Sequence, residues 1–115
     1  MFIPILIILL AFIIVVLALF VFVISAKGKP PQGRALDYLD RGEISQGRLI
    51  TCIGDSLTHG NLGACWVEHL RDEFPQDIFL NEGINGDVVW QVHQRLKPIL
   101  ECRADLVILM IGSND

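Results

Sequence analysis

The sequence predicts an α/β fold, a parallel sheet with helices on its faces, preceded by a membrane-spanning helix. Two observations lead to this prediction. Phe2 to Ile24 is an unbroken apolar stretch. From Arg48 onward, short apolar runs typical of buried strands alternate with segments whose apolar residues recur at helical spacing. The resulting order is β-α-β-α-β, which right-handed crossovers turn into a parallel sheet.

The apolar stretch is long enough to cross a membrane. As a helix, Phe2 to Ile24 would span roughly 35 Å, against a hydrocarbon core of about 30 Å. It also exceeds the apolar region of about 7–15 residues in a secretory signal. We therefore expect a single-pass anchor over residues 1–25 that contacts the membrane through residues 2–24. Ser25-Ala26 offers small residues at which a peptidase could cut, so an export signal remains the alternative.

The charges beside the anchor bear on its orientation. Lys27, Lys29 and Arg34 follow the apolar stretch, and no basic residue precedes it. The positive-inside rule then favours a cytoplasmic soluble part. One helix with so few flanking charges leaves the side of the membrane open.

A linker is expected over residues 26–47. Lys29 to Gly33 includes two prolines in a row, which cannot continue a helix and favour an extended spacer. Ala35 to Arg41 can form one or two helical turns, with Leu36 and Leu39 on one side.

The α/β unit is expected over residues 48–115. Its elements should be a strand at 49–53, a helix at 64–74, a strand at 77–80, a helix at 88–100 and a strand at 104–111. Pro75 follows the first helix as a stop signal. The last strand is apolar on both faces, which favours a central place in a covered sheet. No helix follows it, so we expect the front part of a larger domain.

Composition excludes some functions. After Leu36 the sequence has six basic residues and thirteen carboxylates, and this acidic balance argues against a nucleic-acid partner. Cys52, Cys65 and Cys102 form no C-x-x-C pair, so neither a metal site nor a disulfide framework is indicated. Cys52 and Cys102 are expected in the core, and a single disulfide stays open. No cofactor is implied.

A polar cluster follows each predicted strand. These clusters are Gly54-Asp55-Ser56, Asn81 to Asp87, and Gly112 to Asp115. Because the carboxyl ends of parallel strands share one edge of the sheet, the clusters should converge there. They would bring together a serine hydroxyl, a glycine-rich loop and an asparagine amide. A nucleophile beside hydrogen-bond donors is what acyl transfer requires.

The three clusters resemble the sequence blocks of the SGNH hydrolases, also called the GDSL esterase/lipase family. The matching residues are Gly54 to Thr58, Asn81 to Asp87 and Gly112 to Asp115, and the resemblance covers about residues 48–115. It implies a three-layer α/β/α sandwich around a parallel sheet, the flavodoxin-like SGNH fold. It also implies a serine hydrolase that acts on carboxylic esters, such as lipids, thioesters or acetylated sugars.

The resemblance assigns roles to individual residues. Ser56 would be the nucleophile. The oxyanion hole would consist of the backbone N–H groups of Ser56 and Gly86 and the side chain of Asn114. Asp55 would support the turn through hydrogen bonds to backbone N–H groups. Each residue also has a structural interpretation, since serine often caps helices and glycine permits tight turns.

The sequence departs from the family in one respect. The family's final block supplies an Asp and a His three residues apart, and nothing here matches it. We therefore expect an amino-terminal part of the domain that is a poor hydrolase by itself, with a natural pseudoenzyme as the alternative. From another class, the rival hypothesis is a non-catalytic, membrane-tethered module that binds an ester or glycan.

The remaining aromatic residues are expected to have lesser roles. His59 lies on the loop of Ser56, but its short tether disfavours a well-aligned base. His69 and His93 lie on the predicted helices and are expected at the surface. Trp66 and Trp90 are expected to pack, with Trp90 the better candidate for a pocket wall.

Overall fold

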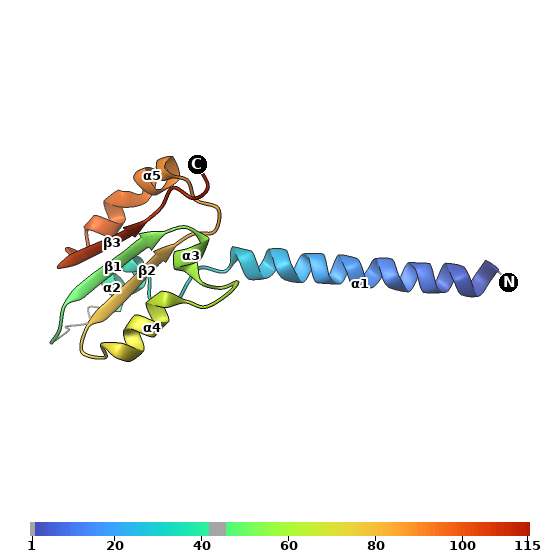
Figure 1. The fold of residues 1–115 in the computed structure, drawn as a ribbon, viewed down its shortest axis with the longest axis horizontal. Coiled ribbons are helices and arrows are strands. Elements are labelled where there is room, and N and C mark those ends of the chain that lie inside the picture. The colour runs from blue at the N-terminus through green and yellow to red at the C-terminus, as the bar shows by residue number, and fades with distance from the viewer. Residues whose placement is uncertain (1, 42–45) are drawn as a thin grey trace.

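The computed structural model describes residues 2–41 and 46–115, and it shows a long helix projecting from a small α/β unit (Figure 1). Its principal extents are 70 × 30 × 24 Å. The helix, α1 (Phe2–Gly28), leaves from one end of the unit, and the chain ends near that same end (Figure 1).

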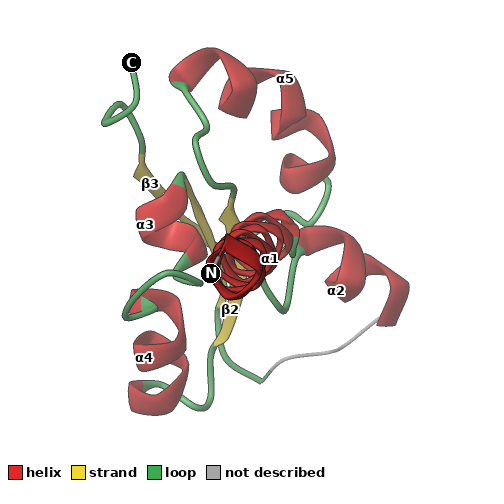
Figure 2. Cartoon of the chain, turned by 90° about the vertical axis from the view of Figure 1, so that its right-hand side faces the viewer, coloured by secondary structure: helices red, strands yellow, loops and turns green. Residues whose placement is uncertain are grey.

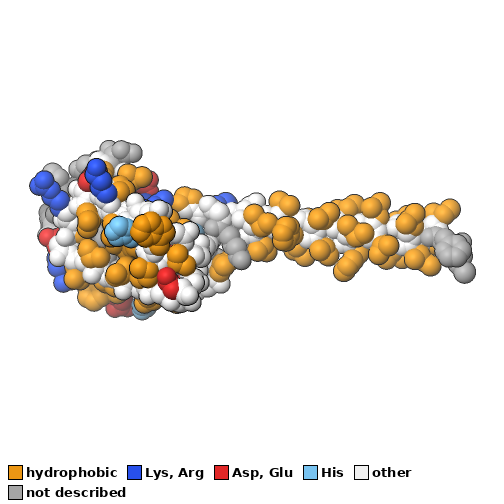
Figure 3. Space-filling model, turned by 90° about the horizontal axis from the view of Figure 1, so that it is seen from above, with side chains coloured by type: hydrophobic (Ala, Val, Ile, Leu, Met, Phe, Trp, Pro, Cys, Tyr) orange, Lys and Arg blue, Asp and Glu red, His pale blue; other side chains and the backbone are white. Residues whose placement is uncertain are grey.

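Helix α1 is apolar on all sides and makes almost no packing contact. Its stretch Ile3–Ala26 has the length and composition to cross a membrane, and none of its most apolar part is buried in the structure. Apolar side chains cover the helix along its length (Figure 3). It is therefore not a core helix of the described unit. A signal sequence has the same composition, so the helix alone does not decide between anchor and signal.

The sheet has three parallel strands in the order β2-β1-β3. They are β1 (Leu49–Gly54), β2 (Ile78–Gly83) and β3 (Leu106–Met110). The predicted parallel α/β architecture is confirmed, and β2 extends three residues further than its apolar pattern suggested because Asn81 and Glu82 are polar yet buried.

The expected central position of the last strand is wrong for the described residues. The strand β3 lies at an edge of the three-stranded sheet, and β1 is central. Four of its five residues are exposed. An apolar pattern on both faces predicts that a strand is to be covered, but it does not specify the order of strands, which the crossovers decide.

Helices cover both faces of the sheet, giving three layers (Figure 2). Alternate residues of β1 point to opposite faces. On one face, Ile50 and Cys52 pack with Val67 of α4 (Trp66–Glu73). On the other face, Ile53 packs with Val92 of α5 (Val89–Leu100).

The same face also carries α2. The helix α2 (Ala35–Arg41) places Ala35 against Leu49 and Leu80, and it confirms the expected short helix after the prolines. Cys52 and Cys102 are buried, as predicted, and all three cysteines are free thiols. Burial raises the pKa of the Cys52 thiol to about 11, which suits a packing role.

The segment before α2 is attached to the sheet. The Gly33 carbonyl accepts a hydrogen bond from the Asn81 N–H of β2 at 2.9 Å. The buried carboxylate of Glu82 accepts from the Ala35 N–H at 2.7 Å and from the Arg34 guanidinium at 2.9 Å. Residues Gly33 to Ala35 of the predicted linker therefore lie along the outer edge of β2. Residues 42–45 of that linker lie outside the described residues.

Candidate active site

The three polar clusters come together at the carboxyl edge of the sheet, defined here as the ends of β1, β2 and β3 at Gly54, Gly83 and Met110. Gly54 is in register with both Gly83 and Met110. The loops that follow the three strands therefore start side by side, as the parallel arrangement predicted.

The first loop turns at once into a short helix, α3 (Ser56–His59), which the sequence patterns did not predict. Asp55 caps it, because its Oδ1 accepts from the Leu57 N–H at 3.0 Å. Ser56 is the first residue of α3 and is half-buried. The turn thus places Ser56 at the carboxyl edge.

Two glycines let α3 lie directly on the strand ends. A Cβ on Gly83 would lie 2.1 Å from the His59 backbone nitrogen. A Cβ on Gly54 would lie 2.2 Å from Thr58 Oγ1 and 2.5 Å from the Met110 carbonyl oxygen. Any side chain at these positions would push α3, and Ser56 with it, away from the sheet.

Asn114 joins the three loops. Its Nδ2 donates to the Asp87 carbonyl at 3.0 Å and to Asp55 Oδ2 at 3.3 Å. The Ser113 hydroxyl also donates to Asp55 Oδ2. Asp55 is 1% exposed and so forms a buried acceptor for both the first and the third loop.

The middle loop carries Gly86, which has a φ of +80° and is exposed. This left-handed conformation favours glycine. A Cβ there would meet nothing within 4 Å, so the backbone conformation and not the space around it calls for glycine. The following residue, Asp87, supplies the carbonyl that holds Asn114.

Arg95 fixes the middle loop, and the sequence patterns missed it. Its Nε donates to Asp87 Oδ2 at 2.8 Å, and its Nη2 donates to the carbonyls of Glu82 and Gly54 at 2.8 and 3.2 Å. A signal was present, because Arg95 stands in the apolar stripe of its helix, three residues after Val92 and four before Ile99.

The sequence patterns also missed the structural role of Asp115. Its carboxylate accepts from the Val89 N–H, with Oδ2 at 3.1 Å. Val89 is the first residue of α5, and the residue before it, Val88, offers no side-chain acceptor. The third loop therefore caps the helix that begins after the second loop, which ties the two together.

The three histidines lie in different surroundings. His59 is buried, its Nδ1 has no hydrogen-bond partner, and burial lowers its pKa while hydrogen bonds to the Lys29 backbone and the Asn85 side chain oppose that shift. His69 and His93 are exposed, as expected. His93 stacks on the exposed ring of Trp90 at 5.6 Å between centroids. Trp66 packs against the core, as predicted, whereas the expectation that Trp90 packs is wrong for the described residues, because Trp90 is 64% exposed.

Metal ligation has no structural support in the residues that the structure describes. No group of three or more His, Cys, Asp and Glu side chains in residues 2–41 and 46–115 is arranged to hold an ion. The chemistry available at the carboxyl edge is that of a hydroxyl, backbone N–H groups and an amide.

Comparison with known proteins agrees with this arrangement. Residues 52–115 match the model of the GDSL-like Lipase/Acylhydrolase family. Among solved structures, the chain is similar to AlinE4, an SGNH-hydrolase family esterase, with 28% identity and a TM-score of 0.53 over 64% of this chain. A comparison with curated proteins gives no match.

The chain belongs to the GDSL-like lipase/acylhydrolase family, since the family model spans more than half of it. The predicted SGNH family and fold are thereby confirmed. The chain spans 44% of the length of AlinE4.

Proposed function

We propose that Ser56 is the nucleophile of a serine hydrolase that acts on carboxylic esters. The observation that carries the proposal is the contact of Asn114 with both Asp55 and Asp87, which joins the serine turn, the Gly86 loop and the third loop at one edge. The oxyanion hole would comprise the backbone N–H groups of Ser56 and Gly86 and the Asn114 amide.

The reaction would proceed through an acyl-enzyme. The Ser56 Oγ attacks the ester carbonyl carbon while a general base takes its proton, and the carbonyl oxygen becomes an oxyanion. Donors at the oxyanion hole stabilise that charge. The C–O bond to the alcohol then breaks, and the alcohol leaves with the proton. Water, deprotonated by the same base, attacks the acyl carbon and releases the acid and Ser56.

The Asn114 amide can exchange one hydrogen bond during this reaction. Of its two bonds, the one to the Asp87 carbonyl at 3.0 Å is shorter than the one to Asp55 at 3.3 Å. An oxyanion would compete for the hydrogen of the longer bond. Asp55 Oδ2 would still accept from the Ser113 hydroxyl, so its buried charge would keep a partner.

The general base is the missing part of this site. The 115-residue sequence contains no Asp-x-x-His, the spacing that the family uses. His59 lies at the opposite end of α3 from Ser56. It forms hydrogen bonds with the Lys29 backbone and the Asn85 side chain. We propose that the Asp and His are outside these residues. Without a base partner, only about 10³–10⁴-fold acceleration over water remains in serine hydrolases.

The second candidate function is a membrane-tethered module that binds an ester or glycan without hydrolysing it. The two functions make opposite predictions for covalent chemistry at Ser56. Only the hydrolase needs an activated hydroxyl.

The test is labelling of the full-length protein with a fluorophosphonate, which reacts with activated serines. We expect labelling that Ser56→Ala abolishes and that Ser45→Ala, a change of a serine that belongs to none of the three polar clusters, leaves intact. Residues 1–115 alone should label at least about 100-fold more slowly, because the base is missing. Equal labelling of Ser56→Ala and the unaltered protein would refute Ser56 as the nucleophile, and no labelling at all would favour the binding module.

A further inference from the structure

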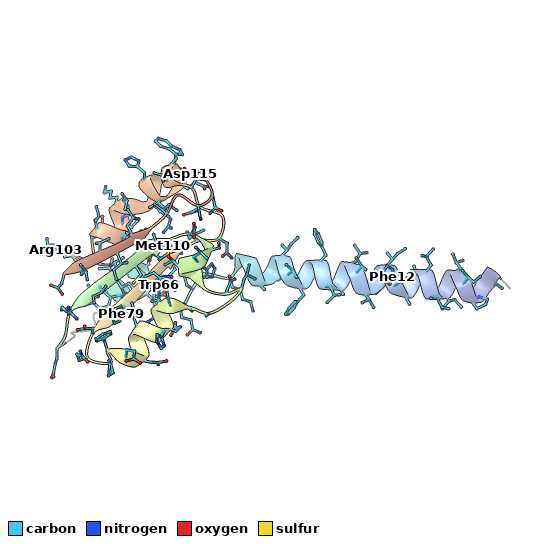
Figure 4. All side chains as sticks on the ribbon, in the orientation of Figure 1. Phe12, Trp66, Phe79, Arg103, Met110 and Asp115 are labelled. Atoms are coloured by element: carbon cyan, nitrogen blue, oxygen red, sulfur yellow. The ribbon has the colours of Figure 1, made fainter. Side chains whose placement is uncertain are left out.

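We propose that the site opens onto the membrane from which α1 emerges and takes its ester from lipids of that bilayer. This inference rests on the proposed function, to which it adds the source and chemical class of the substrate. It starts from the direction of the strands. Asp115, at the carboxyl edge, lies at the end of the unit nearest α1, and Arg103 lies at the far end (Figure 4).

The end of α1 touches the loop that follows Ser56. The Asn61 Nδ2 donates to the Ala26 carbonyl at 2.6 Å. A cavity of about 340 Å³ has Gly28 to Pro31 on one side and Gly83 to Asn85, the end of β2, on another. The chain therefore enters the α/β unit at the carboxyl edge and not at the opposite edge. Seen along α1, the short helix α3 lies beside it (Figure 2).

The contact with Ala26 also fixes a depth. The apolar span runs from Ile3 to Ala26, and as a helix its 24 residues cover about 36 Å. A hydrocarbon core is about 30 Å thick, so the last turn of this span reaches the headgroup region. Asn61 hydrogen-bonds to that last turn, which places the loop after α3 at the membrane surface.

The side chains at the carboxyl edge suit such a surface. Leu57, directly after Ser56, and Leu62, in the next loop, are each 58% exposed. Trp90, on the first turn after the Gly86 loop, is 64% exposed. Trp is enriched at the membrane interface, and exposed Leu side chains gain free energy when they enter it. The opposite edge of the sheet, at the amino ends of the strands, exposes Arg48, Arg103 and Asp105. The exposed Phe74 also lies there.

A cavity joins the membrane span to this edge. It encloses about 430 Å³ and is lined by Phe22, Ser25 and Ala26 of α1 and by His59, Gly60 and Asn61 after Ser56. Phe22 lies inside the apolar span, so the cavity extends from within the span to the end of α3 at His59, one helical turn from Ser56. An acyl chain could follow it while its ester stays at the surface. The substrate class we infer is an acyl ester whose carbonyl lies at the headgroup boundary, as in a glycerolipid.

The orientation is tested without catalysis. The full-length protein is inserted into phosphatidylcholine vesicles that contain phosphatidylcholine with a diazirine near its ester groups, irradiated and mapped by mass spectrometry. We expect adducts on α1 and on residues 57–62, and none on Pro75 and Gln76 at the opposite edge. Adducts on α1 without any on residues 57–62, adducts equally at both edges, or failure of the protein to insert would overturn the proposal.

The substrate is tested with two esters, dioleoyl phosphatidylcholine in the vesicles and p-nitrophenyl acetate in solution. We expect Leu62→Asp to slow hydrolysis of the vesicle ester about 10-fold and to leave the soluble ester unchanged. Leu39→Asp, a change of an exposed leucine on α2, should slow neither. Equal loss on both esters, or no loss on either, would contradict the proposal.

Ser56→Ala separates this inference from the proposed function. If Ser56→Ala abolishes hydrolysis of the soluble ester but residues 57–62 carry no adducts, the hydrolase stands and the membrane-facing site is wrong. If Ser56→Ala leaves both rates unchanged, the proposed function fails, and the lipid substrate fails with it.

Discussion

The two outer strands of the sheet, β2 and β3, are similarly apolar, but their outer edges are covered to different extents. At the β2 edge, Gly33 pairs with Asn81, and the Arg71 guanidinium donates to the Phe79 carbonyl from Nε and Nη2 at 3.1 and 2.6 Å. Leu80 of β2 is 2% exposed. At the β3 edge no strand of the described residues pairs, and Leu109 is 59% exposed.

The difference shows that the outer edge of a strand is covered by segments remote in sequence and not by the strand itself. Exposed N–H and C=O groups on an edge strand invite pairing with other chains, so natural sheets cover or charge such edges. Here the segment between α1 and α2 covers β2. The strand β3 carries no charge among its five residues, so its own sequence gives it no protection.

The largest expected effect is at Glu82, which ties the segment before α2 to β2. Its carboxylate is 1% exposed and accepts from Arg34, Ala35 and Arg95. Glu82→Ala would leave these donors unpaired, and we expect a loss of about 3–5 kcal/mol in unfolding free energy. Urea unfolding in detergent micelles, followed by tryptophan fluorescence, measures it. Glu68→Ala, which removes a more exposed ion pair with Arg71, should cost at most about 1 kcal/mol.

A matched pair of leucines compares the two edges directly. Leu80→Ala should cost about 2–5 kcal/mol, because it opens a cavity in the covered edge. Leu109→Ala should cost under about 1 kcal/mol in residues 1–115, since Leu109 has little packing to lose. The same unfolding measurement on the full-length protein sharpens the comparison. A cost at Leu109 that approaches the cost at Leu80 there would show that β3 is covered in the complete fold.

The cover over β2 can be weakened at Gly33. This glycine has a φ of +68°, and a Cβ on it would lie 2.6 Å from Arg71 Nη2. We expect Gly33→Ala to lower the unfolding free energy by about 1–2 kcal/mol, because the alanine is strained there and displaces the guanidinium. Gly63→Ala, with nothing within 4 Å and no left-handed φ, is the control. Equal thermal midpoints for the two variants would refute the role of Gly33.

The smallest expected effect is a pH dependence from His59. Burial lowers its folded-state pKa below the ordinary value of 6.5, and the nearby Arg34 acts in the same direction. The unfolded chain therefore binds the proton first, and stability falls as the pH drops below about 6.5 toward the lowered pKa. His59→Gln should flatten this part of a stability–pH profile, whereas His69→Gln, at an exposed site, should not. A profile unchanged by His59→Gln would contradict the assignment.

Much of the fold could be predicted from the sequence because its patterns are local. Apolar runs located three strands, helical spacing located α4 and α5, and the polar clusters after the strands located the loops of the candidate site. The strand order could not be predicted in this way, because Leu106 to Met110 is equally apolar in a central or an edge position. The network of Arg95 and Glu82 was also missed, because Arg95 belongs to no local motif and the cluster that contains Glu82 does not indicate which distant groups its side chain binds.

The sequence by itself determined the family, the parallel α/β architecture and the proposed nucleophile, because each depends on residues close together along the chain. Only the tertiary structure decided that Asn114 joins the Asp55 and Asp87 loops and that the Gly33 segment covers β2. It alone also decided that the carboxyl edge lies beside the end of α1. These arrangements depend on contacts across tens of residues, such as Asn61 with Ala26 and Asn114 with Asp55, which no local pattern of hydropathy or charge records.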